Sequence, residues 1–283
     1  MFIKLIDIFI AIYNQQTIKD DILLLSKKIN KINFKDRFSF FEISNFLNKE
    51  IYNELNSTYP EQSLFSEHND FARSFTDEND NFSNFLEQNS QWKNFINEIN
   101  SKVFAEDLIK LFNLKNVYFS ENSWKRKIKI FKKVKLSFCF NISEAGGFSL
   151  PHTDSSRKLV SMVFFFVDSL WNEKNGGQVK LYKPINSVHE NNWRNARVDE
   201  KHLEVLKTII PSPNKIYGFK KTKNSYHSVS PIKEFNSLKR KVLMINLIYE
   251  NKSDSPYYEN KSILKKIKNI IINKLLNVKK KDI

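Results

Sequence analysis

The spacing of hydrophobic residues divides the chain into two regions. Before residue 124 the spacing is mostly helical, and from 125 to 250 it alternates with a period close to two. The clearest helical pattern covers 84–113, with apolar residues at Phe85, Trp92, Phe95, Ile96, Ile99, Val103, Leu108 and Leu111. The pattern predicts helices in the first region and a β-rich second region.

Shorter sequence patterns predict the structure of the rest of the first region. Residues 1–31 predict one or two packed helices rather than a secretion signal, because charges interrupt the apolar opening and no small-residue cleavage site follows. The segment 37–47 predicts a strand leading into a helix that ends near Thr58, since Tyr59–Pro60 disfavours its continuation. The polar, acidic stretch 61–82 predicts a loop or lid.

Short strands separated by Gly, Pro, Asn and Ser are predicted throughout the second region. They are 133–142, 158–168, 177–185, 215–220, 226–232 and 241–250. The segment 158–168 is almost continuously apolar, as expected of a strand buried on both faces. Such a series predicts a β-sandwich or jelly-roll. Residues 186–208, polar and then helical in pattern, predict an insertion over the mouth of the sheet.

Composition narrows the class of protein. With 283 residues, 41% of them hydrophobic, the chain has ample material for a core. No apolar run approaches the ~18 residues of a membrane span, so we expect no transmembrane segment and a cytoplasmic setting. The single cysteine, Cys139, excludes a disulfide scaffold within the chain, and we expect it to be a small core residue.

The net charge of +15 is concentrated in two segments. Residues 125–135 carry seven basic residues and no acid, and residues 260–283 carry eight lysines against Asp282. Each segment is either a solvated face or a site for a polyanion. The helical spacing of 260–280 predicts a helix packed on the fold, with a membrane-surface or partner helix as the alternative.

Two histidines and one aspartate form the strongest chemical signal. His152 and Asp154 precede a buried strand, and residues two apart on an extended backbone point to the same side. His227 lies in another predicted strand and could reach the same point. Two imidazoles and one carboxylate form the facial triad of non-haem Fe(II) oxygenases, which leaves three positions open for chemistry.

A buried arginine and a cluster of glycines accompany this triad. Arg240 opens the apolar strand 241–250, where burying a guanidinium is costly unless an anion is bound. We choose Arg240 over Lys239 and Lys241 because its forked head suits a carboxylate. Four of the five glycines lie near the candidate ligands, at 146–147 and 176–177, which indicates tight backbone geometry.

These motifs, in this order, resemble the iron(II)/2-oxoglutarate dioxygenases, specifically the prolyl-4-hydroxylase-like branch. The resemblance rests on GGFSLPHTDSSRKLVSMVFFFVDSLWNEKNGGQVKLY, KIYGFKKTKNSYHSVSPI and RKVLMINLIYE, and it covers about 134–250. It implies an α+β fold with a double-stranded β-helix (jelly-roll, cupin-like) over 125–250, including the insertion 186–208. Residues 1–124 would be a helical support region with one or more strands joining the core sheet. The resemblance covers neither the insertion 186–208 nor residues 251–283, which we expect to form a basic helical tail.

The resemblance also implies site residues. His152, Asp154 and His227 would ligate Fe(II), and Arg240 would pair with the distal carboxylate of the cosubstrate 2-oxoglutarate. With O2, such an enzyme hydroxylates a primary substrate and releases succinate and CO2, and ascorbate is a candidate reductant. Peptidyl proline, a free amino acid and a sugar or lipid-linked metabolite are alternatives for the substrate. The sequence leaves the oligomeric state open.

The chain departs from the family at two positions. Many relatives place tyrosines beside the cosubstrate on the strands before and after His-x-Asp, where this chain has Phe140 and Phe164. We expect these two phenylalanines to line the cosubstrate pocket. We expect another donor to replace the missing hydroxyls, with Tyr217, Tyr226 and Ser161 as candidates.

Two other functions compete with the dioxygenase. A non-catalytic, cupin-like binding module would keep the barrel without redox chemistry, and only the Phe140 and Phe164 departures favour it. A nucleic-acid demethylase would account for the basic segments. It is disfavoured because the strand that follows Arg240 lacks the second arginine of that branch, so we do not expect a nucleic-acid partner.

Overall fold

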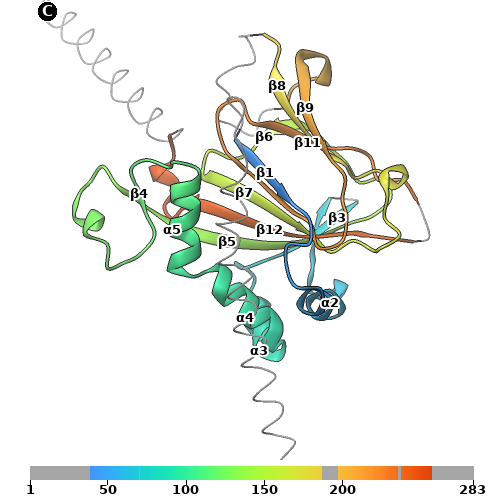
Figure 1. Ribbon diagram of the computed structural model, residues 1–283, viewed down its shortest axis with the longest axis horizontal. Coiled ribbons are helices and arrows are strands. Elements are labelled where there is room, and N and C mark those ends of the chain that lie inside the picture. The colour runs from blue at the N-terminus through green and yellow to red at the C-terminus, as the bar shows by residue number, and fades with distance from the viewer. Residues whose placement is uncertain (1–38, 70, 187–196, 235–236, 257–283) are drawn as a thin grey trace, which may run out of the picture.

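A computed structural model describes residues 39–69, 71–186, 197–234 and 237–256 as two β-sheets and a group of helices (Figure 1). The helices predicted for 1–31 and 260–280 lie outside the described residues. The large sheet contains β1 (Phe40–Ile43), β2 (Ser66–Asn69), β3 (Ala72–Thr76), β4 (Val117–Tyr118), β5 (Lys132–Ser143), β7 (Lys158–Phe165), β10 (Ile216–Lys220) and β12 (Arg240–Tyr249). The small sheet contains β6 (Ser149–Thr153), β8 (Val179–Pro184), β9 (Leu203–Ile209) and β11 (Tyr226–Val229).

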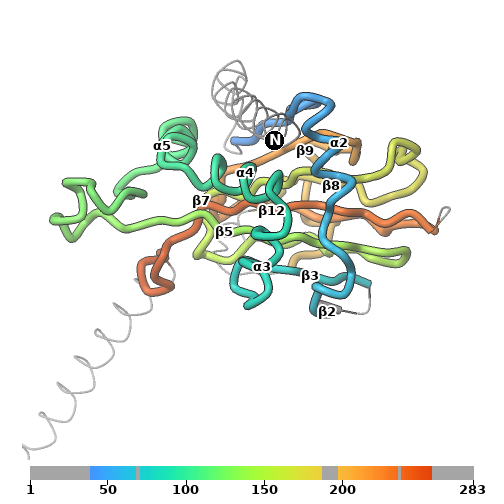
Figure 2. Tube along the Cα trace, turned by 90° about the horizontal axis from the view of Figure 1, so that it is seen from below, coloured from blue at the N-terminus to red at the C-terminus, as the bar shows by residue number. Residues whose placement is uncertain are grey.

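The strands of both sheets pair antiparallel, except that β4 pairs parallel with β5. The order in the large sheet is β1-β10-β7-β12-β5-β3-β2, so β12 lies between β7 and β5 (Figure 2). The order in the small sheet is β6-β11-β8-β9. The mixed helix and sheet architecture expected from the sequence is therefore present, with antiparallel sheets like those of a jelly-roll.

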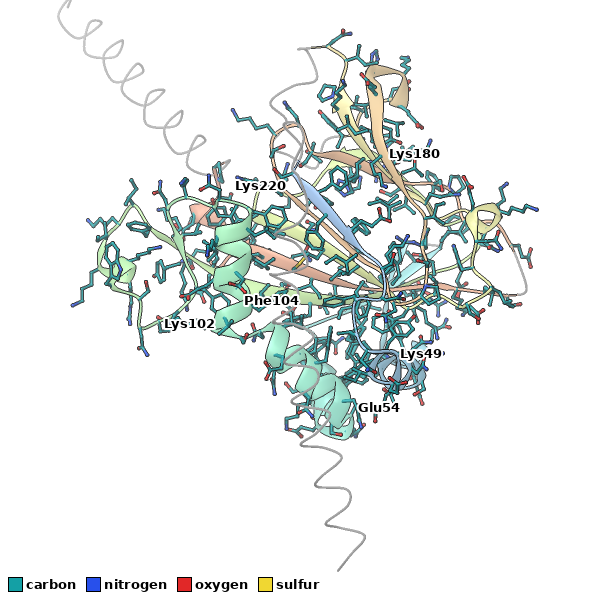
Figure 3. The ribbon with its side chains drawn as sticks, viewed as in Figure 1. Lys49, Glu54, Lys102, Phe104, Lys180 and Lys220 are labelled. Atoms are coloured by element: carbon teal, nitrogen blue, oxygen red, sulfur yellow. The ribbon has the colours of Figure 1, made fainter. Side chains whose placement is uncertain are left out.

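Four α-helices pack against one face of the large sheet: α2 (Lys49–Ser57), α3 (Asn81–Gln88), α4 (Ser90–Ile99) and α5 (Lys102–Leu111). Polar side chains cap two of them, because Asn48 accepts a hydrogen bond from the backbone N–H of Glu50 and Ser101 from that of Phe104. On α5, Phe104 is buried and Lys102 is exposed (Figure 3). Every helix in the described part of the chain is too short or too polar to cross a bilayer.

An aromatic cluster fills the space between these helices and the sheet. Trp92 on α4 packs edge-on against Phe140 on β5, with ring centroids 4.8 Å apart. Tyr59, which follows α2, packs edge-on against the same Phe140 at 5.4 Å. Phe164 on β7 contacts Phe46 at 5.2 Å. Aromatic burial of this extent is the main hydrophobic stabilisation of this layer.

Two parts of the sequence-based prediction are wrong. Residues 61–82 are not simply a loop, because they contain β2 and β3, and β3 pairs with β5. Residues 203–209 are not helical, because they form β9, which pairs with β8. Both segments are edge or near-edge strands whose outward positions are polar, and this polarity conceals the alternation that identifies a strand.

Asparagine is the commonest residue with a positive φ angle in the described part of the chain. Among the described residues, non-glycine positive φ angles occur at Asn45, Asn113, Asn116, Asn214 and Ser237. Asparagine tolerates this conformation better than other residues with a Cβ. The side chain of Asn214 also accepts from the backbone N–H of Leu47 at 2.9 Å and donates to its carbonyl at 2.7 Å.

Candidate metal centre

A cavity of about 590 Å³ lies between the two sheets. The large sheet lines it through β5, β7, β10 and β12, and the small sheet lines it through β6 and β11. His152, Asp154, His227 and Arg240 all line this cavity. The residues that the sequence singled out therefore lie together, although 88 positions separate the first from the last.

The two histidines face each other across neighbouring strands. His152 on β6 is the register partner of His227 on β11, and their ring centroids are 4.3 Å apart. The Nδ1 atom of His152 lies 2.9 Å from the carbonyl oxygen of Leu150, and that of His227 lies 3.3 Å from the carbonyl oxygen of Ser225. A proton on each Nδ1 satisfies these carbonyls and leaves both Nε2 atoms free to act as ligands.

Asp154 follows β6 and is held through both carboxylate oxygens. Ser161 donates to Oδ2 at 2.6 Å, and the ammonium of Lys158 lies 2.8 Å from Oδ1. Burial alone would raise the pKa of Asp154. The charges of Lys158 and His227, with hydrogen bonds from Lys158 and Ser161, instead hold this pKa well below its usual range.

The protonation states suit metal binding. Burial is the main cause that lowers the pKa of His227 to about 4, although Asp154 opposes it. A neutral imidazole and an ionised carboxylate are the forms that coordinate a metal. One ligand atom from each of His152, Asp154 and His227 lies within 4.8 Å of the other two, so the three residues could hold one ion. Two imidazoles and a carboxylate are the donors of an Fe(II) facial triad.

Arg240 is buried in the same cavity. Its guanidinium carbon lies 5.2 Å from the ring centroid of Phe165, and its Nε has no hydrogen-bond partner among the described residues. A Cβ at Gly177 would lie 3.0 Å from Cδ of Arg240, so this glycine leaves room for the arginine. A buried donor without a partner is costly, and an anionic ligand would satisfy it.

The neighbouring lysines face elsewhere. Lys239 pairs with Glu144 at 2.8 Å, and the ammonium of Lys241 lies over the ring of Tyr59 at 5.4 Å. Of the three basic residues at the start of β12, only Arg240 lines the cavity.

Phe140 and Phe164 do not reach the cavity. Both belong to the aromatic cluster under the helices, on the opposite face of the large sheet. The expectation that they line the cosubstrate pocket is not met, because the strand positions that face the cavity are their neighbours Asn141 and Val163. Side chains alternate along a strand, so a shift of one residue exchanges the two faces.

The three candidate replacement donors are placed differently. Tyr217 lines the cavity near Arg240, is fully buried, and has its pKa raised by burial. Ser161 also lines the cavity, but its hydroxyl is engaged by Asp154. Tyr226 lies outside the cavity in a separate cluster with Tyr182. Tyr217 is the donor best placed beside Arg240.

Sequence reasoning did not single out six other polar residues of the cavity, which are Asn141, Ser143, Ser149, Lys158, Arg197 and Asn246. Four of them, Asn141, Ser143, Lys158 and Asn246, lie on the central strands β5, β7 and β12, at positions whose polarity is visible in the sequence. Asn246 on β12 is the register partner of Ser161 on β7 and of Ser137 on β5, which forms a polar row across the sheet. Such polar positions within otherwise apolar strands are the signal that could have identified this face.

Four further residues are of chemical interest because of their type, and the structure describes three of them. Trp171 is buried and donates from Nε1 to the carbonyl of Gly176 at 3.3 Å. Burial raises the pKa of the Cys139 thiol to about 12, so it is not an activated nucleophile. His202 ends a short 3-10 helix and does not line the cavity, and His189 lies outside the described residues.

The mouth of the cavity is apolar. Phe71, Phe148 and Leu150 line it and remain 44%, 54% and 49% exposed. Arg197 is the polar residue beside them, and it forms an isolated β-bridge with His152. Exposed apolar side chains gathered at the rim of a polar cavity mark a surface that contacts a ligand.

We compared the chain with known protein families and with curated proteins. Residues 138–245 match a family model described as the 2OG-Fe(II) oxygenase superfamily. No curated protein matches the sequence.

Solved structures also resemble the chain. A Trichoplax adhaerens prolyl hydroxylase in complex with a hypoxia-inducible-factor peptide fragment is 15% identical, with a TM-score of 0.47 over 85% of this chain and 94% of that one. A Pseudomonas putida prolyl-4-hydroxylase is 12% identical, with a TM-score of 0.44 over 80% and 100%. IDO from Bacillus thuringiensis is 16% identical, with a TM-score of 0.47 over 80% and 95%. Sequence identities this low carry no information about the substrate of this chain.

The matched segment spans β5 to β12 and includes all three candidate ligands and Arg240. The match to the family model covers residues 138–245 and agrees, at the level of the superfamily, with the resemblance drawn from the ordered motifs.

Proposed function

We propose that this protein is an Fe(II)- and 2-oxoglutarate-dependent dioxygenase that hydroxylates a primary substrate at the mouth of the cavity. The observation that carries the proposal is the presence, in one cavity, of the His152–Asp154–His227 donor set and a buried guanidinium whose Nε lacks a partner. The donor set fits Fe(II), and the guanidinium fits the distal carboxylate of 2-oxoglutarate.

His152, Asp154 and His227 would hold Fe(II), which together with 2-oxoglutarate and O2 supplies the oxidising chemistry and yields succinate and CO2. The backbone carbonyls at Nδ1 orient both imidazoles. Ser161 and Lys158 restrict rotation of the Asp154 carboxylate by engaging different oxygens. These contacts preorganise the three ligand atoms.

Arg240 would bind the distal carboxylate of 2-oxoglutarate, and the Tyr217 hydroxyl would donate beside it. Tyr217 then supplies the hydroxyl that many relatives place on the strands before and after His-x-Asp. The surrounding side chains of Val163, Val242 and Met244 exclude water from this end of the cavity. Ascorbate is the candidate reductant that would keep the iron ferrous.

The apolar rim favours a primary substrate that carries an apolar group. Peptidyl proline, an apolar free amino acid and a lipid-linked metabolite each offer such a group, whereas an unsubstituted sugar does not. Arg197 at the rim would pair with an anionic part of the same molecule.

The proposal is tested by adding Fe(II) and 2-oxoglutarate to the protein without oxygen. A weak visible charge-transfer band is expected in the wild type and in His202→Ala, whose histidine lies outside the cavity. The band should be absent from His152→Ala and Asp154→Ala, with circular dichroism showing that both variants are folded. A wild-type protein with no band and no succinate formation would refute the proposal, and a band without any turnover of 2-oxoglutarate would indicate a binding module instead.

A further inference from the structure

A second surface of the molecule has the composition of an interaction site. Residues 119–131 connect β4 to β5, and we call them the basic loop. The loop projects from one end of the large sheet in two perpendicular views (Figures 1 and 2). It adjoins Lys132 at the start of β5, whereas Asn141 and Ser143 at the far end of that strand line the cavity. The basic loop is therefore separate from the candidate metal centre.

The basic loop has a defined internal structure. The backbone N–H of Arg126 donates to the carbonyl of Ser123 at 3.1 Å, and that of Ile128 donates to the carbonyl of Lys125 at 3.0 Å. The ring of Trp124 packs edge-on against Phe131, with centroids 5.8 Å apart. These contacts hold the loop in one conformation, so its outward side chains form a preorganised surface.

Three large apolar side chains of the loop face solvent. Trp124 is 65% exposed, Ile128 is 41% exposed and Ile130 is 59% exposed. Single exposed apolar residues are ordinary, but three within seven positions of one projecting loop are a contiguous apolar feature. Their exposure costs free energy unless a partner covers them.

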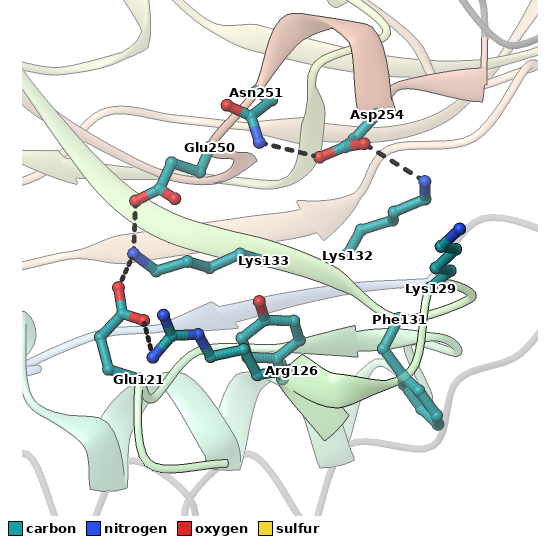
Figure 4. A pocket seen from close by; sticks show the side chains of 10 residues that line it. Glu121, Arg126, Lys129, Phe131, Lys132, Lys133, Glu250, Asn251 and Asp254 are labelled. Atoms are coloured by element: carbon teal, nitrogen blue, oxygen red, sulfur yellow. Dashed lines mark hydrogen bonds and ion pairs between the residues drawn. The ribbon is translucent and has the colours of Figure 1, made fainter. Parts of the chain in front are cut away.

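The basic side chains of the loop and of the two residues after it differ in their partners. Some form ion pairs with nearby acidic residues (Figure 4). These pairs are Lys133 with Glu121 and Glu250, Arg126 with Glu121, and Lys132 with Asp254. Among the described residues, Lys125, Lys127 and Lys129 have no carboxylate within 4.0 Å, and Nζ of Lys125 lies 5.3 Å from the ring centroid of Phe131. Three lysines without an acidic partner therefore alternate in sequence with the exposed tryptophan and isoleucines.

The last described residues lie beside the basic loop. Asp254 pairs with Lys132, the residue that follows the loop, at 3.3 Å, and Pro256 is the last described residue. In the sequence, the segment 260–283 with its eight lysines begins four residues later, outside the described residues.

We propose that the basic loop binds the surface of an anionic phospholipid bilayer. Tryptophan is favoured at the membrane interface, exposed isoleucines insert among acyl chains, and lysines pair with anionic headgroups while their stems lie along the apolar region. A nucleic acid fits less well, because isoleucine neither stacks on bases nor contacts phosphate and only one of the loop's four basic residues is an arginine.

The test is sedimentation of the full chain with phosphatidylcholine vesicles that contain or lack about 30% phosphatidylglycerol. The wild type should bind only the anionic vesicles. Replacing Lys125, Lys127 and Lys129 with glutamine should weaken binding about 100-fold, because each lysine near such a surface contributes about fivefold. Trp124→Ala with Ile130→Ala should weaken it about tenfold. Replacing Lys93, Lys110 and Lys174 with glutamine removes the same charge elsewhere and should leave binding unchanged.

Insertion of the basic loop into the bilayer can be measured separately, by tryptophan fluorescence. Trp92 and Trp171 are buried, and Trp193 is removed by using the Trp193→Phe protein as the reference. In this reference protein, quenching of tryptophan fluorescence by brominated lipid should be present, and the additional change Trp124→Phe should abolish it. The proposal is overturned if the wild type does not bind anionic vesicles, or if the triple lysine variant binds them as the wild type does, which would assign binding to another segment. Two results together would also overturn the proposal. The wild type would bind single-stranded nucleic acid more tightly than it binds anionic vesicles, and the Trp124→Ala, Ile130→Ala variant would bind vesicles as the wild type does.

Discussion

The two faces of the large sheet have opposite compositions although the same strands build both. On the helix-covered face, Phe140, Phe164 and their neighbours form a continuous aromatic cluster. On the cavity face, the adjacent positions of the same strands include Asn141, Ser161 and Arg240. One face is specialised for stability, and the other carries the polar groups of the candidate site at a cost in stability.

This difference shows how the chain separates folding from chemistry. The aromatic face contributes hydrophobic stabilisation that does not depend on any ligand. The cavity face holds an arginine with an orphan donor and a carboxylate whose two oxygens are fixed by Lys158 and Ser161. Substitutions at neighbouring positions of one strand should therefore change different properties.

The largest effect on stability is expected at Phe140. Phe140→Ala removes a fully buried ring from the aromatic cluster and should lower the free energy of unfolding by about 3–5 kcal/mol. Asn141→Ala, one position along β5, removes the hydrogen bond donated to the carbonyl of Arg73 and the one accepted from the hydroxyl of Ser143, and should cost only about 1–2 kcal/mol. Urea denaturation of both variants measures the contrast, and equal losses would contradict the assignment of the two faces.

Replacing Arg240, on the cavity face, should weaken ligand binding without lowering stability. Arg240→Met removes a buried charge, so the cosubstrate-free protein should be as stable as the wild type or more stable. Its affinity for 2-oxoglutarate should fall about 30- to 1000-fold, because a buried charge pair is lost. Lys241→Met, on the other face of β12, is the matched control and should bind 2-oxoglutarate normally. Isothermal titration calorimetry gives the affinities, and unchanged binding by Arg240→Met would remove Arg240 from the site.

The pH dependence of stability should report the burial of His227. In the metal-free protein its pKa is lowered from 6.5 to about 4, so between these pH values the unfolded chain binds one more proton than the folded chain. The free energy of unfolding should therefore decrease as the pH falls through this window, by up to about 1.4 kcal/mol per pH unit. Urea denaturation across the window should show a shallower dependence for His227→Gln. An identical dependence for both proteins would contradict this account.

The smallest effect is expected at Ser161. Ser161→Ala removes the hydrogen bond to Oδ2 of Asp154 and should weaken Mn²⁺ or Co²⁺ binding about tenfold, with little change in stability. Ser137→Ala is the control, because Ser137 lies in the same polar row but donates to Asp77 instead. Equal metal affinities for the two variants would argue against a role for Ser161 in orienting the ligand.

The alternation of residues on the central strands was sufficient to predict the strands and to separate polar from apolar positions. It does not show which set faces the cavity. On β7 both faces are buried, and on β5 the alternation is clear but its buried positions face the helices rather than the cavity. Phe140 and Phe164 therefore lie on the opposite face from the one expected. His152 and His227 could be singled out because their motifs surround them in sequence. Lys158 could not, since its contact with Asp154 depends on the conformation of the turn after β6.

The asparagine at position 214 sets a limit on how this fold can vary. At a left-handed corner, glycine is ordinarily the easier residue, and exchanging Asn45 or Asn116 for glycine would relieve backbone strain. At Asn214 the same exchange would delete the amide that joins the start of β10 to the segment before α2. Glycine at position 214 would keep only the backbone hydrogen bond from Phe46 to the carbonyl of residue 214. At this corner the side chain therefore matters for the connection between two distant segments as well as for the backbone conformation.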